Sequence, residues 1–524
     1  MTETIAPYRS TQPTERAGFG ALLRAEWTKF RSIRAWTIAA AVAVALMLLF
    51  GLLSANGIHS NYQTSPDSQP VVGHPYVPIG PDGEAVTDQF TFVHRSLTGD
   101  GSITARVSDL VGAVQPQEAP AGQASPALSA SALQPWAKAG LIIKANTRQG
   151  SAYAAIMVTP GHGVRMQYDF TGDIAGPASA QWLRLTRSGN TVTGFASADG
   201  STWSTVGRVR LSGLPSTAPA GMFVASPAQT TFTAHFGGGS GSGSGTMSRA
   251  NFDDVALAGQ WSAEAWTATW LGGNRGMPDA RSSNGLSQAG DVYTITGTGD
   301  IAPDTGQSGT SIERTLVGGF AALALLAVLG VLFISTEFRR GLIRTSLTAS
   351  PRRGRVLAAK AVVLGSVAFV VGAVGCAITI PISEHILRAN GNFINPVSTL
   401  TEIRVILGTG ALLAVAAVLA LAIGTIMRRS AVAVATAIVV VVLPYILGTA
   451  GVLPTGPAQW LLRITPAAAF AIQQSIPAYH QVVQAYTPVT GYYPLAPWAG
   501  FAVLCLWAAV ALGAAGYLLR RRDA

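Results

Sequence analysis

The residues whose type and position most clearly suggest a function are six arginines that lie close together in a chain with few charges. They occur in the stretch STEFRRGLIRTSLTASPRRGR, from Ser335 to Arg355, whereas only 11% of the 524 residues are charged. The six are Arg339, Arg340, Arg344, Arg352, Arg353 and Arg355. An apolar run of about twenty residues, long enough to cross a membrane, precedes this stretch and another follows it. Cations in such a position either orient the chain in a membrane or contact a soluble partner, and six exceed what orientation needs.

The sequence lacks the usual catalytic patterns. No lysine follows a glycine, so there is no Walker A loop to hold the phosphates of ATP. There is no HExxH motif, no Cys/His cluster at metal-ligand spacing and no GxSxG nucleophile elbow. We therefore expect this chain to be no enzyme and to bind no metal or cofactor itself.

Six apolar segments are each long enough to cross a hydrocarbon core. Gly, Ala, Val and Leu cover every face of them, which is not typical of helices in a soluble protein. The predicted spans are 35–53, 316–335, 358–380, 403–427, 431–447 and 496–519. The first has no cleavage motif after it, so we expect an uncleaved span and not a signal peptide.

The distribution of positive charge predicts the orientation of these spans. Lys and Arg near span ends favour the cytoplasm, whereas long translocated domains do not follow this rule. The segment 56–312 holds 13 Lys and Arg against 17 Asp and Glu, and 18 of the other 22 basic residues lie on the opposite side. We expect residues 1–34, 336–357 and 520–524 in the cytoplasm and 56–312 outside. Because the arginines flank spans and are not interleaved with aromatic residues, nucleic acid is not an expected partner.

The outer segment changes to short alternating runs broken by Gly, Asn, Asp and Ser. In WLRLTRSGNTVTGFASADGSTW, for example, two strand patterns are separated by the turns SGN and ADGS. This spacing predicts an antiparallel β-sandwich over about 89–257, followed by a small β extension over 258–312. The run GGGSGSGSG at 237–245 predicts a long flexible loop.

Four stretches of this segment resemble the concanavalin A-like jelly-roll domains of bacterial extracellular proteins. They are WAKAGLIIKANT, QWLRLTRSGNTVTGFASADGSTWSTVG, AGMFVAS and ANFDDVAL. The resemblance implies a lectin-like sandwich, and since some relatives bind carbohydrate, a cell-envelope glycan is a candidate partner. By residue type alone, Trp136, Trp182 and Trp203 favour core positions over sugar stacking. Asp253 and Asp254 favour a strand-end cap over a calcium site, so no ligand-binding or metal residue is assigned.

The stretch before the first span, FGALLRAEWTKFRSIRAW, predicts an amphipathic helix. Its apolar face is formed by Phe19, Leu22, Leu23, Trp27, Phe30 and Ile33, and its polar face by Arg24, Thr28 and Arg31. A helix of this kind lies along the inner membrane surface, so we expect contact with membrane lipid.

This helix, the first span and EFRRGLIRTSLTASPRRGRVLAAK after the second span closely resemble type 2 ATP-binding-cassette (ABC) exporter permeases. The resemblance implies an elbow helix that includes Glu26, Trp27, Lys29, Phe30 and Arg31. It also implies that 336–357 is a coupling segment that docks on a separate ATPase subunit. The matching positions are Glu337, Phe338, Arg339, Arg340, Gly341, Arg344, Pro351, Arg352 and Arg353. The large 56–312 insertion departs from the short first outer loop of most members.

The fold class expected is a membrane all-α bundle of six transmembrane helices plus an N-terminal amphipathic elbow helix, with an inserted all-β jelly-roll sandwich. The resemblance implies a bacterial plasma-membrane exporter of an amphiphilic, lipid-like or drug-like substrate. ATP and Mg would bind the partner ATPase, and a second permease copy would complete a homo- or heterodimer. The proline-interrupted segment 452–494 predicts outer re-entrant or interfacial helices. The alternative is a membrane-anchored cell-surface glycan-binding protein, although five spans after the sandwich exceed what an anchor requires.

Overall fold

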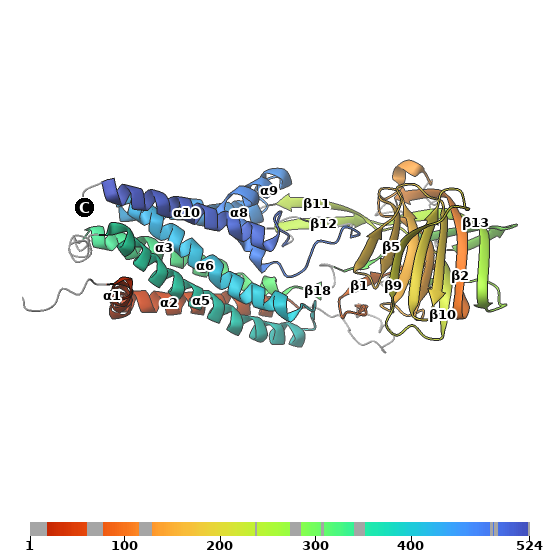
Figure 1. Cartoon of the computed structure of the whole chain (residues 1–524), viewed down its shortest axis with the longest axis horizontal. Coiled ribbons are helices and arrows are strands. Elements are labelled where there is room, and N and C mark those ends of the chain that lie inside the picture. Colours follow the sequence, from red (N-terminus) through yellow and green to blue (C-terminus); the bar gives the residue numbers. More distant parts are fainter. Residues whose placement is uncertain are drawn as a thin grey trace, which may run out of the picture.

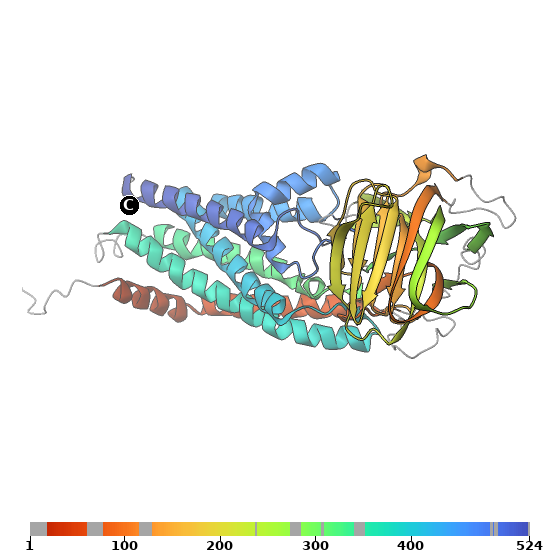
Figure 2. The same ribbon diagram turned by 45° about the vertical axis from the view of Figure 1, so that its right-hand side comes forward.

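The computed structural model describes residues 18–59, 77–114, 128–235, 238–272, 285–304, 309–339, 352–482, 486 and 491–521. The described chain has a helical part and a β part that lie end to end along the long axis (Figures 1 and 2). This confirms the coarse prediction of apolar helices joined to a large β-sheet region.

Six helices of the described chain are long and apolar enough to cross a membrane. They are α2 (Arg34–Gly57), α3 (Gly318–Arg339), α5 (Arg353–Ala389), α6 (Thr399–Met427), the continuous run Ser430–Thr449 and α10 (Pro497–Arg521). The run comprises α7 (Ser430–Ala437), the π-helical turn η4 (Ile438–Val442) and α8 (Leu443–Thr449). The shorter helical elements are α1 (Phe19–Ser32), η3 (Ile312–Leu316), α9 (Thr455–Ile464) and η5 (Pro466–Gln473).

The helices pack closely because small residues lie at their contacts. A Cβ atom at Gly372 of α5 would lie 2.8 Å from the Cα of Gly410 in α6, and one at Gly330 of α3 would lie 2.5 Å from the carbonyl oxygen of Ala417. Such contacts let helix backbones approach where the surroundings supply no hydrophobic driving force. Helices α3 and α6 are the most buried of the six and form the centre of the bundle.

The β part is a barrel-like sheet of thirteen strands in the described residues, built around the long strand β2. Its strands are β2 (Phe90–Val114), β3 (Lys138–Lys144), β4 (Tyr153–Thr159), β5 (Gly163–Tyr168), β6 (Gly172–Ala175), β7 (Trp182–Ser188), β8 (Thr191–Ser197), β9 (Ser204–Arg210), β10 (Thr217–Ala225), β13 (Thr246–Trp261), β14 (Thr267–Leu271), β15 (Gly285–Ala289) and β16 (Val292–Thr298). Strand β2 pairs with β10 and β14 through its first half, with β7 in its middle and with β13 along most of its length. Alternating side chains of these strands fill one large apolar cluster, and residues on the other face of β2, β3, β4 and β10 fill a smaller one.

Short pairs of strands connect the β part to the helices. β1 (Val86–Asp88) pairs with β17 (Ile301–Pro303), so the two ends of the inserted segment run together. β18 (Gly309–Thr310) pairs in parallel with β19 (Phe393–Ile394), which follows α5. The amide of Gln481 adds a hydrogen bond of 3.2 Å from its Nε2 atom to the carbonyl oxygen of Phe170.

The glycine-rich run is not the flexible loop that its composition predicts. β12 (Gly238–Ser244) pairs residue for residue with β11 (Gln229–His235) as an antiparallel ribbon. This ribbon extends from the sheet toward α8 and α9 (Figure 1). The prediction was wrong because backbone hydrogen bonds form the ladder without side chains, while the threonine-rich partner strand supplies the β propensity that glycine lacks.

Two further expectations for the outer segment also differ from the structure. In the described part of 258–312, β14 pairs with β2 and β16 pairs with β13, so these strands belong to the main sheet and not to a separate small extension. Trp136 is buried as expected, but Trp182 and Trp203 are only half-buried. The guanidinium of Arg184 lies 4.0 Å from the ring centroid of Trp203, so this indole is covered by a cation and not by a core.

The β part buries both of its lysines. The Nζ atom of Lys144 lies 2.7 Å from Oδ2 of Asp88, and both side chains are fully buried. The rings of Phe90, Tyr153 and Phe170 surround this ammonium group at 5.4–5.8 Å. Lys138 forms the equivalent ion pair with Asp300. These pairs connect β3 to both β1 and β17, which hold the ends of the inserted segment.

We expect Asp88→Ala to lower the free energy of unfolding of the β part by about 3–5 kcal/mol, because Lys144 would keep a buried charge without its partner. Chemical denaturation followed by tryptophan fluorescence measures the change. The control is Asp291→Ala at an exposed position, which should change stability by no more than about 0.5 kcal/mol. Equal effects of the two substitutions would contradict the assigned role of the pair.

Candidate functional site

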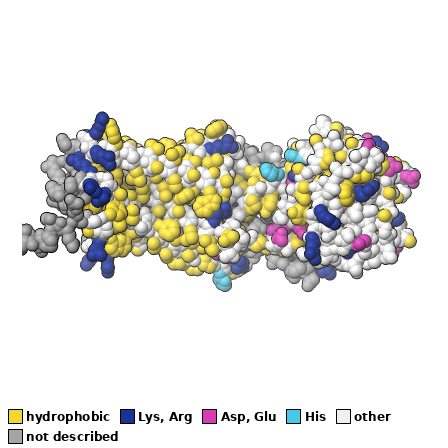
Figure 3. All heavy atoms as spheres, in the orientation of Figure 1, with side chains coloured by type: hydrophobic (Ala, Val, Ile, Leu, Met, Phe, Trp, Pro, Cys, Tyr) yellow, Lys and Arg dark blue, Asp and Glu magenta, His cyan; other side chains and the backbone are white. Residues whose placement is uncertain are grey.

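Basic side chains gather at the end of the bundle that lies farthest from the β part. In Figure 3 an apolar band separates these cations from the mixed charges of the β part. The described arginines of this end include Arg339 at the end of α3, Arg352, Arg353 and Arg355 at the start of α5, Arg428 and Arg429 between α6 and α7, and Arg520 and Arg521 at the end of α10. Helix α1 lies at the same end and runs crosswise to α2 (Figure 1).

At the centre of this end is a buried cluster of four charges, Glu26, Lys29, Glu337 and Lys360, which we call the charge cluster. The Nζ atom of Lys360 lies 2.7 Å from Oε2 of Glu26 and 2.6 Å from Oε1 of Glu337. Lys29 lies 3.0 Å from Glu26 and 3.5 Å from Glu337. The cluster therefore connects α1, the last turn of α3 and the second turn of α5.

Because the charge cluster is buried, each of its charges needs the opposite charges beside it. The Lys360 side chain is fully buried, and Glu26 and Glu337 are 3% and 12% exposed. Removing one partner from such a group leaves an uncompensated charge in a low-dielectric environment. Lys29 is the exposed edge: burial opposes its charge, but hydrogen bonds and attraction to Glu26 and Glu337 outweigh burial and raise its pKa.

Aromatic rings surround the charge cluster and orient α1. The Lys360 ammonium lies 4.8 Å from the ring centroid of Phe333 in α3. Phe30 of α1 and Trp36 of α2 contact the same ring edge-on at 5.9 and 5.8 Å. Phe30 is buried and Trp27 beside it is 48% exposed. The apolar face expected for this helix is thus divided between a contact with the bundle and an outward-facing indole.

The structure places some of the predicted coupling residues at this end. Glu337, Phe338 and Arg339 form the last turn of α3, and the Arg428 guanidinium lies 5.1 Å from the ring centroid of Phe338. Nη1 of Arg353 donates a hydrogen bond of 2.7 Å to the carbonyl oxygen of Leu519 in α10. Arg339 and Arg352 of the predicted coupling segment have exposed side chains, as does Arg31 of the predicted elbow helix. Arg340, Gly341, Arg344 and Pro351 lie outside the described residues.

Sequence reasoning missed the centre of this site. The sequence does not single out Lys360, and it indicates Glu26 and Glu337 only as members of motifs. A detectable signal was present, because an ionisable residue inside an apolar helix requires a partner. Its partners lie 334 and 23 residues away along the chain, so no spacing rule could identify them.

The charge cluster is suited to positioning and not to metal binding. No group of three or more His, Cys, Asp and Glu among the described residues could hold a metal ion. Within the cluster, each carboxylate already pairs with a cation, so the cluster sets how α1, α3 and α5 meet.

Comparison with known proteins identifies the helical part. Residues 178–524 match the family model described as ABC-2 family transporter protein. The chain belongs to this family. The matched range includes five of the six apolar helices and begins within the β part. The ABC-2 membership supports a membrane-embedded, multi-pass permease component that works with an ABC ATPase subunit, as the motifs around the arginines predicted.

The other comparisons add little. No curated protein matches this ABC-2 chain. One similar solved structure is described as the crystal structure of a functionally unknown protein from Saccharomyces cerevisiae; it is 13% identical, covers 33% of this chain and 75% of its own, and has a TM-score of 0.19. A TM-score this low supports no argument, so the concanavalin A-like character of the β part stays a prediction.

We expect Lys360→Met to release α1 from the bundle, because Glu26 and Glu337 would lose their buried cation. Limited trypsin digestion should cut within α1, at Arg24 or Lys29, at least tenfold faster than in the unmodified protein. Arg355→Met removes an exposed cation from the same helix and should leave the cleavage rate unchanged. Equal rates for both variants would show that the charge cluster does not hold α1.

Proposed function

We propose that this ABC-2 protein is the transmembrane permease subunit of an exporter that moves an amphiphilic, lipid-like or drug-like substrate out of the cell. A separate ATPase subunit would supply the energy and bind ATP and Mg. The observation that carries this proposal is the charge cluster, since it connects α1 to the helices on both sides of the predicted coupling segment 336–357. A push on that segment by a docked ATPase would therefore reach three helices at once.

The basic end of the bundle supports a docking role. Arg339 ends α3, and Arg352 and Arg355 have exposed side chains at the start of α5. Exposed cations can steer and hold a partner through electrostatic complementarity. With Glu26, Glu337 and Lys360 paired internally, the arginines remain the groups that face outward.

The same charge distribution supports an orientation for the chain. The arginine-rich end, which includes both described ends of the chain, would lie in the cytoplasm according to the positive-inside rule. The six apolar helices would be the spans, α1 would lie along the inner membrane surface as the elbow helix, and the β part would lie outside. Residues 452–494, with the short elements α9 and η5, would form the outer interfacial segment.

The cargo follows from the composition of the six apolar helices. Away from their ends they carry few ionisable groups, which suits an amphiphilic substrate better than an ion or a proton. A second permease copy, identical or related, would complete the path. The β part would gate the outer end or bind cell-envelope glycan. The ABC-2 match over the helices favours this proposal over a membrane-anchored glycan-binding protein.

We expect Arg339→Ala combined with Arg340→Ala and Arg344→Ala to reduce the amount of ATPase subunit that co-purifies by at least tenfold, because three cations of the predicted coupling segment are lost. Quantitative mass spectrometry of the affinity-purified complex measures this ratio. The matched control is Arg208→Ala with Arg210→Ala and Arg249→Ala, three exposed arginines of the β part. Unchanged co-purification in the first variant would refute the docking assignment.

The orientation is tested with single cysteines in a background that carries Cys376→Ala and Cys505→Ala. We expect a membrane-impermeant maleimide to label Ser212→Cys in intact cells, since this exposed residue belongs to the β part. Arg355→Cys, exposed at the opposite end, should be labelled only after the cells are permeabilised. The reverse pattern would invert the proposed topology.

A further inference from the structure

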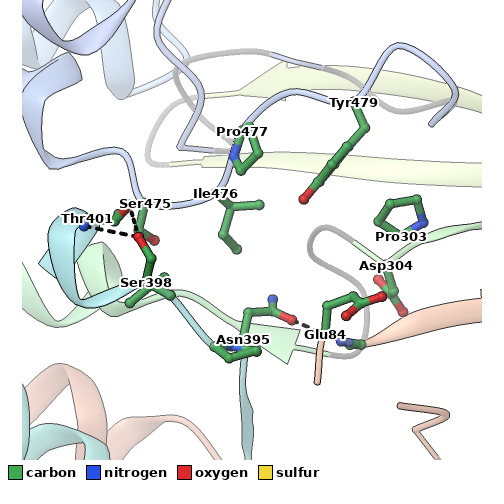
Figure 4. A pocket seen from close by; sticks show the side chains of 13 residues that line it. Glu84, Pro303, Asp304, Asn395, Ser398, Thr401, Ser475, Ile476, Pro477 and Tyr479 are labelled. Carbon is green, nitrogen blue, oxygen red and sulfur yellow. Dashed lines mark hydrogen bonds between the residues drawn. The ribbon is translucent and has the colours of Figure 1, made fainter. Parts of the chain in front are cut away.

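A cavity of about 200 Å³ lies where the β part meets the helical part (Figure 4). We call it the junction cavity. Its polar lining comes from three regions that are far apart in sequence: Glu84 and Asp304 beside β1 and β17, Asn395 and Ser398 before α6, and Ser475 and Tyr479 after η5. Its volume is several times the roughly 30 Å³ that one water molecule occupies, so it has room for a small organic ligand.

Glu84 brings an unpaired carboxylate to the junction cavity. Both of its carboxyl oxygens are buried and neither has a hydrogen-bond partner. Burial, with smaller contributions from the nearby Asp82 and Asp169, outweighs the opposing effect of the neighbouring backbone N–H groups and raises the pKa of Glu84 to about 7. Asp304 lies next to it, because the Asp304 amide donates a hydrogen bond of 2.8 Å to the carbonyl oxygen of Ala85. This wall of the cavity therefore favours a positively charged ligand.

Asn395 brings an unpaired donor to the same cavity. Its side chain is only 6% exposed, and its Oδ1 atom accepts a hydrogen bond of 3.4 Å from the backbone N–H of Ala85. Its Nδ2 atom is buried without an acceptor, and Figure 4 shows this amide pointing into the cavity. A buried donor without a partner is costly unless something supplies an acceptor.

Apolar side chains line the cavity between the polar groups and suit the hydrocarbon part of a ligand. Pro303, Val397, Ile476 and Pro477 line the cavity between the polar groups, so a short hydrocarbon chain fits there. No metal site of three or more His, Cys, Asp and Glu occurs in the described residues, which favours an organic cation over a metal ion.

We propose that the junction cavity binds a small primary ammonium ligand that also carries an oxygen acceptor, as in an amino alcohol. The ammonium group pairs with the Glu84 carboxylate, the ligand oxygen accepts from Nδ2 of Asn395, and the methylene groups lie against the prolines. A free amino alcohol and the ethanolamine headgroup of a lipid share this chemistry. Because the lining joins the β part to the start of α6 and to the segment after η5, the ligand holds these two parts together.

Isothermal titration of the full-length protein in detergent with ethanolamine tests the proposal. Ethylamine lacks the oxygen, choline lacks the N–H donors and ethylene glycol lacks the charge. We expect ethanolamine to bind at least tenfold more tightly than each of the three. Equal affinity for all four compounds, or no ethanolamine binding, would overturn the proposal.

Two variants separate the roles of the two groups. Glu84→Gln should weaken ethanolamine binding at least tenfold, whereas Glu264→Gln, at an exposed position of the β part, should leave it unchanged. Asn395→Ala should reduce the affinity for ethanolamine to that for ethylamine, while the ethylamine affinity itself stays the same. The unfolding temperature without ligand shows that each variant is folded. Wild-type affinity in both Glu84→Gln and Asn395→Ala would overturn the assignment.

The pH dependence gives a third readout. The groups that face Glu84 are Asp82, Asp169, Asp304 and Tyr479. Because Glu84 must lose its proton to pair with an ammonium group, ethanolamine affinity should rise between pH 6 and pH 8, and Glu84→Gln should abolish this rise. An equal rise in Glu84→Gln would assign the titration to another group and contradict the proposal.

Nanodiscs separate the two sources of the ligand. If the ligand is a lipid headgroup, phosphatidylethanolamine discs should weaken the apparent ethanolamine affinity at least tenfold relative to phosphatidylglycerol discs. If it is a free amino alcohol, the two affinities should agree. Absence of ethanolamine binding in both kinds of disc would overturn the site, and it would leave the proposed docking of the ATPase untouched.

Discussion

The arrangement of the helical part depends on the burial of one ammonium group. Lys360 is fully enclosed, and its charge is balanced by Glu26 of α1 and Glu337 of α3. Since a buried charge that loses its partner is strongly destabilising, these ion pairs favour one arrangement of the three helices. Helix α1 is therefore held to the bundle by electrostatics, with Phe30 and Phe333 packed beside the ion pairs. Two members of this cluster, Glu337 and Lys360, flank the segment between α3 and α5.

Buried lysines also form ion pairs in the β part, where Lys144 pairs with Asp88 and Lys138 pairs with Asp300. Every lysine of the chain thus pairs with a carboxylate, and three of the four are fully buried. Arginines instead supply the exposed cations of the basic end. The division has a physical reason: a compact ammonium group is enclosed by a few acceptors, whereas a guanidinium group has five donors to satisfy.

In the described residues, the β part and the helical part are connected by hydrogen bonds and not by buried ion pairs of this kind. Short strands, the Asn395 amide and Gln481 connect them by a few hydrogen bonds. The junction cavity lies among these contacts and contains polar atoms without partners. A junction with unsatisfied groups responds to a ligand more readily than either well-packed core, so a ligand would act on the β part here.

The sequence by itself determined the division into apolar helices and a β part, because span length and two-residue alternation are local properties. It also indicated the ABC-2 family through the residues around the arginines, and the family comparison confirmed this. Composition failed at the glycine-rich run, where the partner strand β11 decides the conformation. Only the tertiary structure decided that Lys360 meets Glu26 and Glu337, and that Glu84 and Asn395 share one cavity. These groups are separated by up to 334 residues, and a pairing over such a distance depends on how helices and strands pack, which no local pattern encodes.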